Sequence, residues 1–143
     1  MENSKSVAVL GGGSFGTVLA NLAASNGYNV SLWVRDSEQA LRINSEGANT
    51  TYHPELKLSK NIIASDNLKE VLNNKSIIFI ATPSIVFEQI VIRVSYYIDE
   101  KPYLVSCTKG ILDDPFRLLS DIISSKLKNT IGVLSFDEIM SDN

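Results

Sequence analysis

The chain has 143 residues, 44% hydrophobic and 20% charged, which is enough for one buried core and too few for two ordinary domains. Its formal net charge of −3 provides no positive field, which argues against nucleic acid and membrane surfaces as partners. It has one cysteine and no signal-peptide pattern, and its longest apolar run (Ser76 to Ala81) is far shorter than the ~20 residues of a membrane span. These features favour a cytoplasmic protein with a small soluble ligand.

The first third of the chain predicts a strand, a glycine turn, a helix and a second strand. Ser6 to Leu10 is apolar at nearly every position, as in a strand covered on both faces, and Gly11 to Gly13 end it. A helical period begins at Ser14 and ends at Asn26-Gly27, and Asn29 to Val34 is the second strand. A helix capped by Asp36 or Ser37 then runs to about Glu46.

The rest of the chain continues the alternation after a surface loop from Gly47 to Lys60. The predicted strands are Asn61 to Ala64, Ser76 to Ala81, Tyr103 to Cys107 and Thr130 to Leu134. The predicted helices are a short one capped by Asp66 and ending at Leu72, Ser84 to Tyr97, and Pro115 to Leu127. This alternation predicts a single-domain α/β fold of the Rossmann type: a doubly wound, mainly parallel sheet in a three-layer α/β/α arrangement over residues 1–135.

Gly11, Gly13 and Gly16 form the pattern G-x-G-x-x-G between the first strand and the first helix. The first glycine permits the tight turn, the second lets the backbone approach a pyrophosphate, and the third lets helix and strand pack closely. The start of the helix then faces the anion. This context predicts a site for NAD or NADP, with a purely structural glycine turn as the alternative.

Two charged residues follow the second strand, where such folds recognise the adenosine ribose. A carboxylate there suits the hydroxyls of NAD, whereas an arginine suits the 2′-phosphate of NADP. Asp36 is interpreted as the cap of the next helix, so Arg35 tilts the choice toward NADP. The alternative for Arg35 is a solvated surface side chain.

Four further residues have polar or reactive side chains that need an interpretation. Lys109 follows a buried strand, at the edge where open α/β sheets bind ligands, and a lysine suits a phosphate; its alternative is an exposed turn lysine. Cys107 is interpreted as a core residue, since no histidine lies near it in sequence. His53, in the long loop, is interpreted as incidental. Ser84 is expected to cap its helix.

Four stretches in this order resemble the bacterial-type NAD(P)-dependent glycerol-3-phosphate dehydrogenases: GGGSFGTVL (11–19), LWVRD (32–36), ATPS (81–84) and TKG (108–110). The resemblance covers the chain up to Ser135. It implies an oxidoreductase of glycerophospholipid metabolism that interconverts dihydroxyacetone phosphate and sn-glycerol 3-phosphate by hydride transfer.

The resemblance also implies roles for individual residues. The implied cofactor contacts are the glycine turn and its neighbours, the ends of other strands, and one loop residue: Gly11, Gly13, Ser14, Phe15, Gly16, Arg35, Tyr52, Pro83 and Lys109. Lys109 would also approach the substrate phosphate. No residue is assigned as catalytic, because the resemblance puts the catalytic lysine in a second, helical domain. No metal site is expected.

The chain departs from the family after Ser135. It continues with Phe136-Asp137-Glu138 where the family has Gly-Pro-Ser/Thr-Phe-Ala, and residues 136–143 form a short tail in place of the helical domain. We therefore expect a truncated chain that binds the cofactor with little or no turnover. Two alternative functions stay open: a non-catalytic dinucleotide-binding module acting with a partner chain, and another dehydrogenase with the same domain order. A homodimer also stays open.

Overall fold

The computed structural model describes residues 5–107, 111–113 and 116–134. Its centre is a six-stranded sheet in the order β3-β2-β1-β4-β5-β8, in which all neighbouring strands are parallel. The strands are β1 (Ser6–Leu10), β2 (Asn29–Trp33), β3 (Ile62–Ser65), β4 (Ile77–Ile80), β5 (Tyr103–Ser106) and β8 (Ile131–Val133). This order is that of a doubly wound Rossmann sheet, so the predicted fold class is confirmed.

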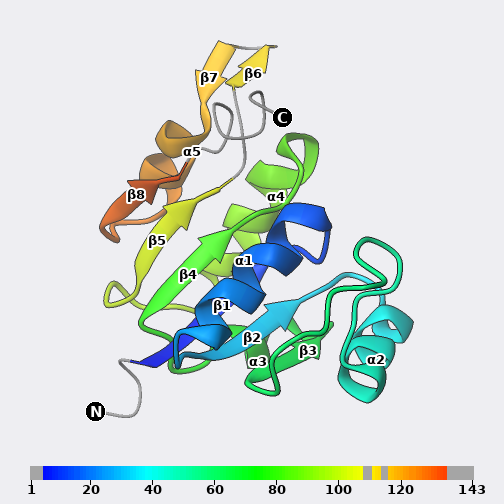
Figure 1. Cartoon of the computed structure of the whole chain (residues 1–143). Coiled ribbons are helices and arrows are strands. Elements are labelled where there is room, and N and C mark those ends of the chain that lie inside the picture. Colours follow the sequence, from blue (N-terminus) through cyan, green and yellow to red (C-terminus); the bar gives the residue numbers. More distant parts are fainter. Residues whose placement is uncertain (1–4, 108–110, 114–115, 135–143) are drawn as a thin grey trace.

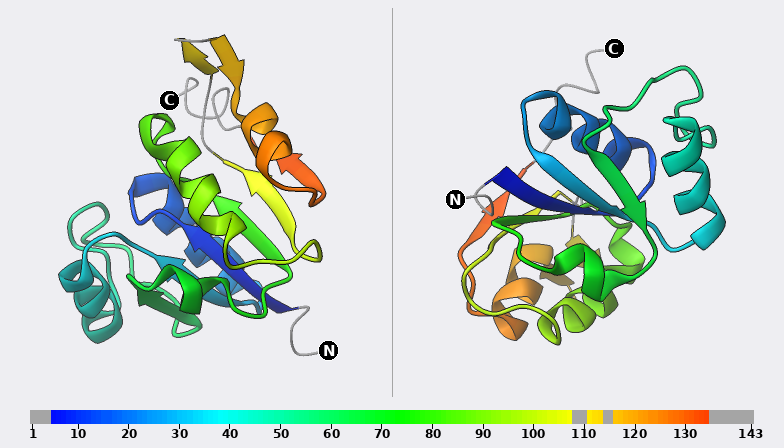
Figure 2. Two further views of the ribbon diagram at one scale, coloured as in Figure 1. Left: turned by 180° about the vertical axis from the view of Figure 1, so that it is seen from behind. Right: turned by 90° about the horizontal axis from the view of Figure 1, so that it is seen from below.

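Helices cover both faces of the sheet and make the three layers (Figures 1 and 2). The helices are α1 (Ser14–Ser25), α2 (Ser37–Glu46), α3 (Leu68–Leu72), α4 (Ser84–Ser95) and α5 (Leu119–Lys126). Figure 2 shows α1 and α2 on one face and α3, α4 and α5 on the other. Among the described residues, no helix is both long and apolar enough to cross a membrane.

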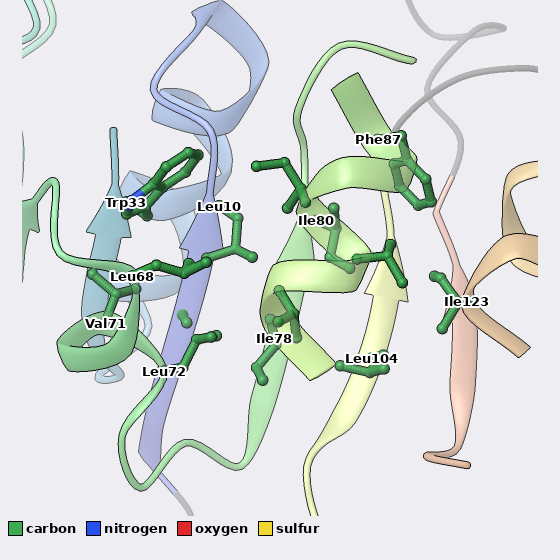
Figure 3. Close-up of a cluster of buried hydrophobic side chains, with 14 of the residues drawn as sticks. Leu10, Trp33, Leu68, Val71, Leu72, Ile78, Ile80, Phe87, Leu104 and Ile123 are labelled. Atoms are coloured by element: carbon green, nitrogen blue, oxygen red, sulfur yellow. The ribbon is translucent and has the colours of Figure 1, made fainter. Parts of the chain in front are cut away.

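Each face of the sheet buries its own hydrophobic cluster. The cluster under α3, α4 and α5, drawn in Figure 3, contains Ile78, Ile80, Phe87 and Leu104, none of which is exposed to solvent. The other cluster lies under α1 and α2. Because strands buried on both faces have apolar residues at nearly every position, the sequence of β1 and β4 identifies them as central strands.

The chain reverses its direction of progress across the sheet between β1 and β4. From β1 it moves outward through α1 to β2 and on to β3, and after α3 it returns to β4 on the other side of β1. The turns that leave the carboxyl ends of β1 and β4 therefore go to opposite faces. In open α/β sheets this switch point is where ligands bind.

Three of the predicted local structures are wrong. Residues 116–118 are not helical: β6 (Ile111–Asp113) and β7 (Phe116–Leu118) pair as an antiparallel hairpin, and this pairing occupies their backbone groups until α5 begins. Asn67, not Asp66, caps α3, because its side chain accepts a hydrogen bond from the Glu70 amide. Ser84 does not cap α4 but is its first residue; the cap position is Pro83, whose backbone is extended.

Cys107 follows β5 and is 8% exposed, within the cluster under α1 and α2. Burial removes water from around the thiol and raises its pKa to about 12 from an ordinary value of 9.0. The thiolate is the reactive form of cysteine, so this environment suppresses reactivity. The interpretation of Cys107 as a core residue is confirmed.

We predict that Cys107 resists alkylation in the folded protein. At pH 8 the difference between 9.0 and about 12 lowers the thiolate fraction about a thousandfold relative to the unfolded chain. Iodoacetamide labelling followed by mass spectrometry, with and without urea, measures both rates. The free energy of unfolding should also fall as the pH rises above about 9, since only the unfolded thiol then ionises. Similar labelling rates in the two states would contradict the buried environment.

Candidate dinucleotide site

The glycine turn (residues 11–16) leaves β1 at the switch point and touches the end of β4. Gly11 has a φ of +124°, which favours glycine. A Cβ atom at this position would lie 2.6 Å from the Ala81 carbonyl oxygen and 3.2 Å from the Thr82 nitrogen. Gly11 therefore permits both the turn and the contact between the two strand ends.

The other two glycines of the pattern have opposite environments. A Cβ atom on Gly16 would lie 1.9 Å from the Gly11 carbonyl oxygen, so α1 packs directly on the turn. Apart from its own chain neighbours, no atom of the described residues would lie within 4 Å of a Cβ atom on Gly13, whose φ is an ordinary −78°. Gly13 is thus needed neither for its conformation nor for packing within the protein, and its side is open.

Two helices begin at this edge of the sheet without a capping side chain. The cap positions are Gly13 for α1 and Pro83 for α4, and neither side chain makes a capping hydrogen bond. The amides in the first turn of a helix point outward and carry a partial positive charge. Such helix starts favour an anion.

The carbonyl groups of Gly12 and Gly13 are bonded within the protein. The Gly13 oxygen accepts from the Thr17 amide at 3.0 Å and from the Thr17 hydroxyl at 2.7 Å. The Gly12 oxygen accepts from Asn49 Nδ2 at 2.8 Å and from Gln39 Nε2 at 3.0 Å. The sequence does not predict the roles of Asn49 and Gln39, since a buried asparagine in a polar loop has no periodic signal. The one signal for Asn49 is a loop long enough to return to the turn.

Arg35 and Asp36 follow β2 at the same edge. The Asp36 carboxylate accepts a hydrogen bond from the Glu38 amide at 2.9 Å, which confirms Asp36 as the helix cap. Arg35 is exposed, and within the described residues its guanidinium group has no partner. The carboxylate is therefore engaged by α2, whereas the positive charge beside it is available.

The long loop returns to the start of α1 with His53. Its Nε2 atom lies 2.9 Å from Ser14 Oγ and 3.0 Å from the Ser14 carbonyl oxygen. The neighbouring Tyr52 is 49% exposed, and Phe15 is partly buried against the cluster under α1 and α2. The histidine interpreted as incidental thus touches the glycine turn.

Two predicted site residues remain, Pro83 and Lys109. Pro83 is exposed between β4 and α4, close to the Gly11 contact. Lys109 lies outside the described residues. The structure therefore brings the glycine turn, Ser14, Phe15, Tyr52 and Pro83 to one region, with Arg35 at the end of the neighbouring strand β2. Their contacts with a cofactor stay predictions.

Comparison with known proteins identifies a close set of relatives. Residues 6–137 match the family model described as the NAD-dependent glycerol-3-phosphate dehydrogenase N-terminus. The chain is 42% identical over 135 residues to glycerol-3-phosphate dehydrogenase [NAD(P)+] of Alcanivorax borkumensis, covering 94% of this chain and 39% of that protein. The corresponding enzyme of Teredinibacter turnerae is 40% identical over 136 residues, covering 94% and 40%. The chain thus spans about 40% of the length of these relatives.

Solved structures agree with the sequence matches. The glycerol-3-phosphate dehydrogenase of Coxiella burnetii superposes with a TM-score of 0.84 at 31% identity, over 91% of this chain and 40% of that one. A ketopantoate reductase of Ralstonia eutropha superposes with a TM-score of 0.70 at 14% identity, over 90% of this chain and 40% of that one. The second likeness shows the fold alone.

We predict that Gly16→Ala destabilises the protein, because its methyl group would overlap the Gly11 carbonyl. The expected loss in the free energy of unfolding is about 1–3 kcal/mol, the usual cost of overpacking an interior. Urea denaturation followed by circular dichroism measures it. Gly13→Ser is the control: its Cβ meets nothing within 4 Å, and serine is a good helix cap. Equal stability of Gly16→Ala and the unmodified chain would disprove the close packing of α1.

Proposed function

The chain belongs to the NAD-dependent glycerol-3-phosphate dehydrogenase family, as a match to its amino-terminal part, and we propose that it binds NAD or NADP at the glycine turn. One observation carries the proposal. Gly11 and Gly16 pack against protein backbone, whereas Gly13 faces open space at the start of α1. The residues present fit a pyrophosphate, because among the described residues the space beside Gly13 is open and the Gly12 and Gly13 carbonyls are bonded within the protein.

The residues around the turn would contact the rest of the cofactor. Ser14 is exposed as the first residue of α1, and Phe15 follows it. Pro83 is exposed at the end of the adjacent strand, and Tyr52 is half exposed in the loop that reaches Ser14 through His53. These positions support the contacts that the family resemblance implies.

Arg35 supports a preference for NADP within this proposal. A guanidinium group pairs bidentately with a phosphate, and the 2′-phosphate is what distinguishes NADP from NAD. Asp36 has a structural role of its own, since one oxygen of its carboxylate caps α2. The cytoplasmic location and the homodimer expected from the sequence stay predictions.

We extend the proposal to the reaction that the relatives' name indicates, the interconversion of dihydroxyacetone phosphate and sn-glycerol 3-phosphate. The bound reduced nicotinamide would supply a hydride to the carbonyl carbon of the ketone, and the carbonyl oxygen would take up a proton. The task of this domain is to hold the dinucleotide. Lys109 is proposed to neutralise the substrate phosphate.

We also propose that the dinucleotide-binding domain ends at residue 135 and that residues 1–143 alone have little or no turnover. Near-attack positioning of the ketone and a proton donor are both needed for catalysis, and one lysine does not supply both. In the sequence, Asp137 and Glu138 follow Phe136 where the family has a Gly-Pro-Ser/Thr segment that helps to hold the substrate phosphate. Carboxylates near a phosphate would repel it, since like charges repel. This sequence difference favours the second candidate, a module that binds dinucleotide without catalysis. Oxidation of NADPH by dihydroxyacetone phosphate, measured with and without a relative's helical domain, distinguishes the two.

The proposed site predicts that Gly13→Val loses dinucleotide binding. The valine side chain would occupy the open space and block the amides, so we expect the dissociation constant for NADPH to rise about 10- to 100-fold, as for loss of a hydrogen bond to a charged group. Isothermal calorimetry measures it. Gly132→Ala is the control, since its Cβ makes only an ordinary 3.7 Å contact with Val105. Unchanged affinity in a folded Gly13→Val protein would mean that the dinucleotide does not bind there.

The role of Arg35 predicts a selective loss. In Arg35→Ala the affinity for NADPH should fall about 10-fold or more, while the affinity for NADH stays within about twofold, because only NADPH carries the 2′-phosphate. The same calorimetric titrations with both cofactors test this. Arg42→Ala, on the neighbouring helix α2, controls for the general loss of positive charge. Equal losses for the two cofactors would return Arg35 to the solvated surface.

A further inference from the structure

Asn49 is a buried polar residue in the long loop, only 1% exposed, and every polar atom of its side chain has a partner. Its Nδ2 atom donates to the Gly12 carbonyl at 2.8 Å and to the Thr17 hydroxyl at 2.8 Å. Its Oδ1 atom accepts from Gln39 Nε2 at 3.3 Å, and Gln39 also donates to the Gly12 carbonyl. The long loop and α2 thus both donate hydrogen bonds to the Gly12 carbonyl of the glycine turn.

The network controls both carbonyl groups at the start of α1. Asn49 and Gln39 bind the Gly12 oxygen directly. Asn49 donates to the Thr17 hydroxyl, which in turn donates to the Gly13 oxygen at 2.7 Å. Asn49 thus holds the Gly12 peptide directly and supports the Gly13 peptide through Thr17, whose amide also bonds the Gly13 oxygen at 3.0 Å.

The orientation of these peptides determines where their amides point. In a trans peptide the N–H and C=O bonds point in opposite directions. Because the Gly12 oxygen points toward Asn49 and the Gly13 oxygen toward Thr17, the amides of Gly13 and Ser14 point the other way. Within the described residues neither amide has an acceptor, and the space beside Gly13 is open.

We propose that Asn49, supported by Gln39, is a positioning residue that orients the Gly13 and Ser14 amides toward a pyrophosphate. The proposal rests on the proposed function of the glycine turn and adds residues outside the G-x-G-x-x-G pattern to it. A peptide free to rotate would present a carbonyl oxygen to the anion in part of its population. A peptide that is fixed before the ligand arrives does not have to be ordered on binding, so the free energy of ordering it does not reduce the affinity.

Asn49→Asp is the sharpest test, since it keeps the size of the side chain and removes both donors. A carboxylate oxygen would repel the Gly12 carbonyl and would accept the hydrogen that Thr17 now donates to Gly13. We expect the dissociation constants for NADPH and for ADP-ribose, which share the pyrophosphate, to rise about 10- to 100-fold in calorimetry.

Asn129→Asp is the matched control. Asn129 is 6% exposed, and its Nδ2 atom donates to the Asp99 and Pro102 carbonyls at 2.9 and 2.8 Å, remote from the turn. Both variants should lower stability, so stability alone does not test the proposal. Only Asn49→Asp should raise the dissociation constants for both ligands. In Asn129→Asp these constants should stay within about twofold of those of the unmodified chain. Equal affinities in the two variants would overturn the proposal.

A second measurement separates this proposal from the proposed function. In ¹⁵N-resolved NMR spectra of the ligand-free protein, the Gly13 and Ser14 amide resonances should move in Asn49→Asp and not in Asn129→Asp. If the unmodified chain binds neither NADPH nor ADP-ribose, the proposed function fails, and these resonances still decide whether Asn49 orients the turn. If they do not move, the positioning role is wrong.

A second variant is available if Asn49→Asp fails to fold. Gln39→Met removes one donor to the Gly12 carbonyl, and we expect it to lower the affinity for ADP-ribose about 3- to 10-fold. An unchanged affinity would overturn the proposal.

Discussion

The packing of α1 on the backbone of the glycine turn is the contact on which the rest of the site depends. With a hydrogen atom as the side chain of Gly16, the helix approaches the Gly11 carbonyl closely enough that a methyl group would overlap it. This approach sets the start of α1 at the switch point, next to the end of β4. A larger residue would push the helix away from the sheet and would displace its start, where the pyrophosphate is proposed to bind. The fold and the site therefore share one steric constraint.

A second constraint is electrostatic. A turn that offers amides to an anion also contains carbonyl oxygens, and these would repel the same anion if they faced it. In this protein the Gly12 and Gly13 oxygens are bonded by side chains of the loop, α2 and α1. The long loop between α2 and β3 is therefore part of the site rather than a connection only. His53, which touches Ser14 from the same loop, extends this contact to the solvent side.

The sequence predicts the parts of this structure that repeat and misses those that depend on one side chain. Apolar runs separated by turn residues predict the six parallel strands to within a residue or two, because burial on both faces leaves a direct pattern. The choice of Asn67 over Asp66 as a cap depends on one residue of register, which propensity does not resolve. The β6–β7 hairpin is missed because apolar residues near Pro115 suit a helix start as well as a strand. Asn49 has no pattern at all, since its role follows from a contact across 37 positions.

The same reasoning separates what the fold explains from what the family explains. Glycine packing and oriented amides would serve any dinucleotide, and the fold is shared with a reductase of different name at low identity. We therefore expect discrimination between dinucleotides to arise from the side chains at the other strand ends. At the end of β2 one oxygen of the Asp36 carboxylate accepts a hydrogen bond from the Glu38 amide and so caps α2. The exposed Arg35 guanidinium group has no partner among the described residues, and this supports the proposed preference for a phosphorylated ribose.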